Sequence, residues 1–162
     1  IRDRLGVVSA YPLWNNAILP VLFVVSALSA GLAATSLVGL ITDRERFEQM
    51  WLIKKSHVIL SAIEMVVLAT MLIIVSSGSP EGAASVASLV SGQYAPMFWG
   101  GLVLLGLVAP FAIEGYPVFV TRKVETSTTS MVVSVIGEGG VLVGGFMLRL
   151  LVILAALPVL YL

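Results

Sequence analysis

The stretch Leu52–Ser76, LIKKSHVILSAIEMVVLATMLIIVS, decides the fold. It is long enough to cross the hydrocarbon core of a bilayer, which takes about 20 mainly apolar residues. It nevertheless carries His57 and Glu64 within the apolar run, and a charged side chain there costs roughly 2.5–3.5 kcal/mol on insertion scales. The stretch therefore predicts a membrane helix whose polar side chains have a use.

Three further windows have the same apolar character: Ile18–Ile41, Met97–Val120 and Met131–Leu157. Hydrophobic residues make up 59% of the 162-residue chain and charged residues only 11%, whereas soluble domains carry about 25% charged residues. We therefore expect an all-α integral membrane protein, in which residues 1–162 form one antiparallel four-helix transmembrane bundle. The formal net charge is zero, so nothing indicates a nucleic-acid partner.

The residue types present exclude several kinds of site. The chain has no cysteine, which rules out a disulfide, a thiolate zinc site and an iron–sulfur cluster held by this chain. Its single histidine, His57, excludes a bis-histidine haem within one copy. We expect no metal either, because one histidine with scattered glutamates lacks a spacing that would converge on one ion. No catalytic residue is predicted, and any cofactor of this chain is expected to be lipid-soluble.

The distribution of basic residues predicts the orientation. They concentrate between the first and second spans and between the third and fourth: Arg44, Arg46, Lys54, Lys55, Arg122 and Lys123. The positive-inside rule then places these two loops in the cytoplasm and both ends of the segment on the outer face. Arg2 and Arg4 oppose this assignment. The start Ile1-Arg2-Asp3-Arg4 lacks an initiator methionine, which we interpret as an internal cut in a longer protein, with a processed N-terminus as the alternative.

Small residues predict how the helices pack. Gly140 and Gly144 are four residues apart in the last span, and the first span has two such pairs, Ala27 with Gly31 and Ala30 with Ala34. In lipid such spacings let helix backbones approach closely. Pro110 lies in mid-span, so we expect it to kink the third helix and to free a carbonyl group near Gly106.

Five ionisable residues lie deeper within the predicted spans than Lys54 and Lys55, which stand at the start of the second: His57, Glu64, Glu114, Glu138 and Arg149. At about 1.5 Å of rise per residue, His57, Glu114 and Glu138 fall at similar depths near the cytoplasmic side, with Glu64 near the middle and Arg149 toward the outer face. His57, Ser61 and Glu64 share one face of their helix, as do Glu138, Leu142, Gly145 and Arg149. The aligned polar residues predict a proton or water pathway with protonatable groups at graded depths.

A purely structural role for the same residues is an alternative. A buried glutamate can be protonated and hydrogen-bonded, so that it only holds helices together. Arg149 can extend to the interface or pair with one carboxylate. His57 lies close to Lys54 and Lys55, and it can therefore be an interfacial residue at a helix start.

Several segments, taken in order, resemble the NrfD/PsrC family, the membrane subunits of polysulfide-reductase-type molybdoenzyme complexes. The first span resembles the start of the family's fifth helix, in the segments Pro12–Asn16, Leu19–Phe23 and Ser26–Gly31. Gly92–Trp99 with Gly106 and Pro110 resembles the beginning of the seventh helix. His57 and Glu64 resemble the polar pair of the sixth helix, and Gly144–Gly145 with Arg149 resembles the closing helix.

The resemblance implies a subunit of two four-helix bundles, of which this chain is the second, in a bacterial cytoplasmic membrane. Family members exchange electrons between quinol (menaquinol or ubiquinol) and a ferredoxin-like iron–sulfur subunit, which serves a molybdopterin-type catalytic subunit. The membrane subunit is itself non-catalytic and holds no metal. The family's quinone pocket lies largely in the first bundle, so no residue here is assigned to quinone binding, and some related members are thought to translocate protons.

Two alternatives belong to other classes of protein. Proline and glycine interruptions in the third and fourth spans are also typical of the broken helices of secondary transporters, so the first alternative is half of a proton-coupled carrier. The second is a structural anchor that only tethers its partners.

Overall fold

The computed structural model describes residues 17–42, 51–121 and 128–156, which are almost entirely helical, with no strand among them. The helices are α1 (Ile18–Thr42), α2 (Trp51–Gly78), α3 (Pro80–Val90) and α5 (Thr128–Ala156). Between α3 and α5 runs a long helical segment, the third span, made of η3 (Met97–Val108), α4 (Ala109–Tyr116) and η4 (Pro117–Thr121). The predicted all-α class is confirmed.

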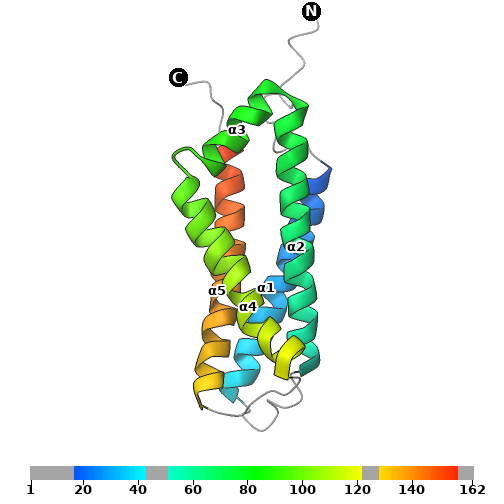
Figure 1. Cartoon of the computed structure of the whole chain (residues 1–162), viewed down its shortest axis with the longest axis vertical. Helices are drawn as coiled ribbons and strands as arrows, with labels where there is room; N and C mark the ends of the chain where they lie inside the picture. Colours follow the sequence, from blue (N-terminus) through cyan, green and yellow to red (C-terminus); the bar gives the residue numbers. More distant parts are fainter. Residues whose placement is uncertain (1–16, 43–50, 122–127, 157–162) are drawn as a thin grey trace, which may run out of the picture.

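The long helices run alternately down and up, and the short α3 crosses one end of the bundle (Figure 1). We call the opposite end, where α1 ends and α2 begins, the base. Helix α1 packs against α2 and α5, and α4 packs against both α2 and α5 near the base. The antiparallel four-helix arrangement expected from the sequence is therefore present.

The surface of the bundle is largely apolar, and several ionisable side chains are buried in its interior. Four helices are long and apolar enough to cross a membrane: Ile18–Thr42, Leu52–Gly78, Met97–Val120 and Thr128–Ala155. Large apolar side chains such as Val24, Ile63 and Phe146 point outward, whereas Glu114 and Glu138 are buried. A water-soluble protein has the reverse distribution. The chain is an integral membrane protein.

The third span is wound more widely than an α-helix on both sides of α4. The N–H of Ala109 donates to the carbonyl oxygen of Leu104, five residues back, which is the π-helical pattern. The next hydrogen bond of this pattern, from position 110 to the carbonyl oxygen of Leu105, is missing because Pro110 has no N–H. The freed carbonyl is thus that of Leu105, beside the predicted Gly106. A Cβ atom on Gly140 would lie 2.6 Å from the Leu105 oxygen, so α5 needs a glycine where it crosses this carbonyl.

The predicted small-residue contact is present in α5. Gly144 lies directly against Gly106 of the third span, and a Cβ atom on either glycine would overlap the Cα atom of the other. Such contact between backbones gives close van der Waals packing without a hydrophobic driving force. The pair Gly140 and Gly144 therefore joins α5 to the third span.

The predicted packing face of α1 is wrong for three of its four residues. Ala27, Gly31 and Ala34 are exposed, and nothing lies within 4 Å of the place where a Cβ atom of Gly31 would be; Ala30 is half-buried and lies near Gly145 of α5. The buried face carries serines instead, and its members are Leu19, Leu22, Ser26, Ser29, Ala33, Ser36 and Leu40. Small residues occur on both sides of α1, so their spacing alone could not show which side faces the bundle.

Candidate functional site

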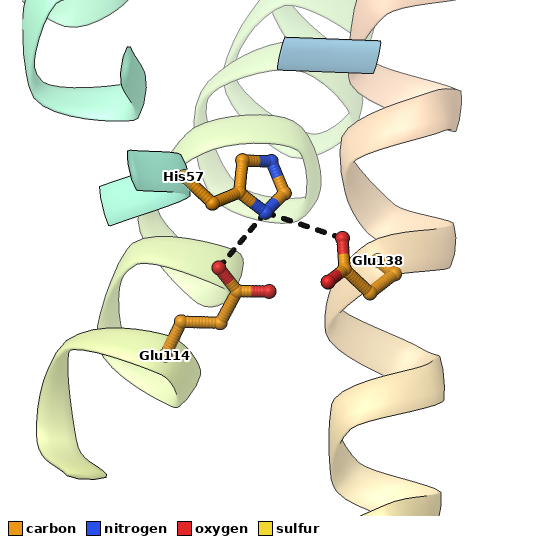
Figure 2. A group of neighbouring side chains, drawn as sticks. All are labelled: His57, Glu114 and Glu138. Atoms are coloured by element: carbon orange, nitrogen blue, oxygen red, sulfur yellow. Dashed lines mark ion pairs between the residues drawn. The ribbon is translucent and has the colours of Figure 1, made fainter. Parts of the chain in front are cut away.

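Three of the predicted site residues meet inside the bundle near its base. His57 comes from α2, Glu114 from α4 and Glu138 from α5. His57 Nδ1 lies 2.9 Å from Glu114 Oε2 and 3.2 Å from Glu138 Oε2, and the three side chains expose 0%, 2% and 1% of their surface. Figure 2 shows both carboxyl groups turned toward the same ring nitrogen. Three residues from separate helices thus form one buried ionic contact.

The contact becomes ionic when His57 is protonated, and its geometry is not that of a directed hydrogen bond. Neither carboxylate oxygen lies where the Nδ1–H bond points, so His57 Nδ1 makes no hydrogen bond of normal geometry within the described part of the chain. The second ring nitrogen, Nε2, lies on the far side of the ring from both carboxyl groups (Figure 2) and is also unpaired among the described residues. The imidazole therefore presents one nitrogen to the carboxylates and the other to a different part of the interior.

A fourth charged residue, Lys54, belongs to the same site. Its side chain is 4% exposed, and its Nζ donates a 2.7 Å hydrogen bond to Ser134 Oγ of α5. The charges of Glu114 and Glu138 act on it. We call Lys54, His57, Glu114 and Glu138 the ion cluster. Lys54 was predicted to be one of the basic residues between the first and second spans, and this prediction is wrong for its buried side chain. Its three-residue spacing from His57 on one helix face was the available signal.

Packing between α4 and α5 sets the positions of the two carboxylates. Pro110 is buried, and its Cγ atom would lie 3.4 Å from a Cβ atom on Gly140. Glu114 follows Pro110 by one helical turn, and Glu138 precedes Gly140 by two residues. The proline–glycine contact therefore holds α4 and α5 together close to the place where both carboxyl groups reach His57.

Glu64 is a separate buried carboxyl group. It lies on the same face of α2 as His57, seven residues on, which is about 10 Å further from the base. It is 5% exposed. The Ser26 hydroxyl of α1 is its polar neighbour, and the charges of His57 and Arg149 reach it. The contact falls short of normal hydrogen-bond geometry, because Ser26 Oγ makes no such bond with any described residue.

Arg149 lies outside the interior that the sequence predicted for it. Glu138 and Gly145 on the predicted stripe are buried, but Arg149 is exposed. Its Nη1 donates to the carbonyl oxygen of Gly145, one turn back on its own helix, over 3.3 Å. The side chain therefore runs along α5 beside the bundle, and only its charge acts on Glu64.

Comparison with known proteins identifies the family of this chain. The sequence profile described as "Polysulphide reductase, NrfD" matches residues 3–160. The chain belongs to the NrfD family. It is similar to a protein named "Protein NrfD homolog" from Haemophilus influenzae, with 26% identity over 93% of this chain and 46% of that protein. It is also similar to the C chain of polysulfide reductase from Wolinella succinogenes, with 29% identity over 68% of this chain and 36% of that protein.

The extent of these matches bears on what the chain is. This NrfD-family chain spans about half the length, or less, of the curated relatives it matches. No solved structure gives a significant match. The arrangement of the ion cluster is therefore known here from the geometry of this chain alone.

Three residues of the ion cluster in this NrfD-family chain could also serve as ligands of a metal ion. His57, Glu114 and Glu138 each offer one ligand atom, and these atoms lie within 4.8 Å of one another. The prediction that the histidine and the glutamates are too scattered to converge on one ion was therefore wrong. Charge balance still favours a metal-free cluster, because protonated Lys54 and His57 offset two carboxylates, whereas a divalent ion beside Lys54 would leave a buried net positive charge. The absence of a metal stays a prediction.

Proposed function

We propose that this chain is the C-terminal half of the membrane subunit of a quinone-linked oxidoreductase complex. In this proposal the full subunit exchanges electrons between quinol and a ferredoxin-like iron–sulfur subunit, which serves a molybdopterin-type catalytic subunit. Membership of the NrfD family supports it, as does the likeness to a protein named as part of polysulfide reductase. The same membership favours this role over that of half a secondary transporter.

Within that subunit we propose that the buried carboxyl groups and His57 carry protons. The observation that carries this proposal is the contact of His57 with Glu114 and Glu138 inside an apolar bundle. Each of the three side chains can hold a proton, and at these separations a proton can pass between them without large motion. Reduction of a quinone takes up two protons with two electrons, and oxidation of the quinol releases them, so such a subunit needs a route for protons through its apolar interior.

The route we propose begins at the base of the bundle. The ion cluster lies there, and Glu64 is the next protonatable group toward the α3 end. The proposal includes a bacterial cytoplasmic membrane with the base on the cytoplasmic side. That orientation depends on Arg44, Arg46, Arg122 and Lys123, which lie outside the described residues.

The test uses the full-length subunit in its complex, reconstituted into vesicles. We expect Glu114→Gln, Glu138→Gln and Glu64→Gln each to slow proton uptake during quinol turnover, because an amide cannot accept a proton at these positions. Glu81→Gln is the matched control, since Glu81 is an exposed carboxylate in the first turn of α3. Proton uptake and quinone reduction would be measured together, with the complex driven in the direction of quinone reduction.

The outcomes separate this proposal from its alternatives. If proton uptake and quinone turnover keep their wild-type rates in all three variants, the ion cluster has only a structural role, which is to hold α2, α4 and α5 together. Substrate uptake by the membrane protein without any iron–sulfur partner would overturn the oxidoreductase assignment in favour of a transporter.

A further inference from the structure

Two sets of hydroxyl groups in this bundle differ in their partners. Seven hydroxyls, most of them exposed, donate to a carbonyl three or four residues back: Thr35, Thr42, Ser56, Thr70, Ser76, Ser88 and Ser91. This is the expected arrangement where lipid offers no other partner. Ser26, Ser29 and Ser36 on the inner face of α1 differ. Their Oγ atoms are buried and make no hydrogen bond with any described residue.

The contrast exists within a single helix. Thr35 and Ser36 are adjacent in α1, and Thr35 on the outer side donates to the Gly31 carbonyl while Ser36 on the inner side does not bond its own backbone. Ser26, Ser29 and Ser36 expose 1%, 0% and 1% of their surface. A buried hydroxyl without a partner is costly. The inward direction of these three hydroxyls therefore points to a partner inside the bundle.

The three serines lie along the same stretch of the interior as the protonatable groups. Ser26 lies beside Glu64. At about 1.5 Å per residue, Ser29 is about 5 Å nearer to the base than Ser26, and Ser36 is about 10 Å nearer again. On α2, Ser61, which is also buried, is about 5 Å nearer to the base than Glu64, and His57 is about 10 Å nearer than Glu64. Ser29 is therefore level with Ser61, and Ser36 lies one step of about 5 Å on the base side of His57.

We propose that Ser36, Ser29 and Ser26 bind a file of internal water molecules that links His57 Nε2 to Glu64. Successive levels are about 5 Å apart, and one water with two hydrogen bonds of about 2.8 Å spans such a step. Buried waters are found where polar groups lack protein partners, as these hydroxyls and His57 Nε2 do among the described residues. This inference rests on the proposed function only for its role as a proton route; the water sites themselves do not depend on it.

A glycine of α5 faces Ser26. A Cβ atom on Gly145 would lie 3.6 Å from Ser26 Oγ, 3.8 Å from Ala30 Cβ and 3.8 Å from Arg149 Nη1, which are ordinary contacts. A methyl group therefore fits next to this hydroxyl, on the side of α5, and it would compete with a water bound there. Gly145→Ala would fill that space without a clash, whereas Gly144 in the preceding position tolerates no Cβ atom at all.

The experiment compares two changes along the file with two controls, all in the full-length complex. Ser29→Ala removes a water-binding hydroxyl, and Gly145→Ala occupies the space beside Ser26. Thr70→Ala removes a hydroxyl that bonds its own helix, and Gly139→Ala adds a methyl group on α5 where nothing lies within 4 Å. The measurements are a high-resolution structure of each variant and the rate of proton uptake during quinol turnover.

We expect ordered waters beside Ser29 and Ser26 in the wild type and in both controls, with the nearest one lost in each test variant. Proton uptake should fall about tenfold in Ser29→Ala and Gly145→Ala, the factor that corresponds to one missing hydrogen bond at the barrier. A wild-type structure that shows waters elsewhere in the complex but none at these hydroxyls would overturn the inference. If the waters are present but Glu64→Gln and Glu114→Gln leave proton uptake unchanged, the water sites are confirmed and the proton route is refuted.

Discussion

Gly106 and Gly144 touch backbone to backbone where the third span crosses α5. Neither residue can carry a Cβ atom, because that atom would overlap the Cα atom of the other glycine. The contact lies between the ion cluster and the α3 end, and it fixes how α5 leans on the third span. The positions of Glu114 and Glu138 relative to each other depend on this crossing, together with the Pro110–Gly140 contact nearer to them.

We predict that Gly144→Ala destabilises the subunit and disturbs the ion cluster. Forcing a methyl group into a closed contact costs about 1–3 kcal/mol, and here the two helices must separate to admit it. The apparent melting temperature of the purified complex should fall. Gly139→Ala on the same helix is the control, because its methyl group meets nothing within 4 Å. Equal stability of the two variants would contradict the contact.

Much of the fold could be predicted from hydropathy alone. The windows Ile18–Ile41 and Met97–Val120 end within a residue of the helices found there, and the last helix begins at Thr128 rather than Met131. Length and apolar character determine a membrane helix almost completely. The π-helical winding of the third span could not be predicted, since it depends on contacts with α5 as well as on Pro110.

The site was only partly predictable, for two physical reasons. Similar depths indicated that His57, Glu114 and Glu138 lie near one another, and the structure brings them together. Lys54 was missed because a lysine near a helix end usually reaches the interface. The serines of α1 were missed because a hydroxyl in a membrane helix can always bond its own backbone, so sequence does not show which serines turn inward.

A second prediction concerns Lys54. Lys54→Met removes a cation from a buried site that holds two carboxylates, and breaking a buried charge pair costs about 3–5 kcal/mol. We expect poor assembly of the subunit, measured as the yield of intact complex from membranes. Adding Glu138→Gln removes one negative charge and should recover much of that yield.

The control for this experiment is Lys55→Met, which removes an exposed lysine from the adjacent position. It should assemble like the wild type. If the double variant is no better than Lys54→Met alone, the charge-balance account of the ion cluster fails, and Lys54 acts through its packing or its bond to Ser134.

A third prediction tests the metal-free state of the ion cluster. Purified complex should contain no zinc or manganese in proportion to this subunit, and chelators should leave proton uptake unchanged, because Lys54 and His57 already offset the carboxylates. Elemental analysis of the wild type and of His57→Gln would check this. One divalent ion per subunit in the wild type, absent from His57→Gln, would instead establish a metal site at His57, Glu114 and Glu138.

The last prediction concerns Arg149, whose charge acts on Glu64 from beside the bundle. Arg149→Leu should slow proton uptake, because it removes a positive charge that acts on Glu64, a proton carrier of the proposed route. Arg149→Lys keeps that charge and should stay close to the wild type. The pair of variants separates charge from shape, since lysine cannot reproduce the planar guanidinium and its hydrogen bonding. If both variants fail to assemble, Arg149 supports the subunit through its guanidinium; if both work normally, it has no part in the route.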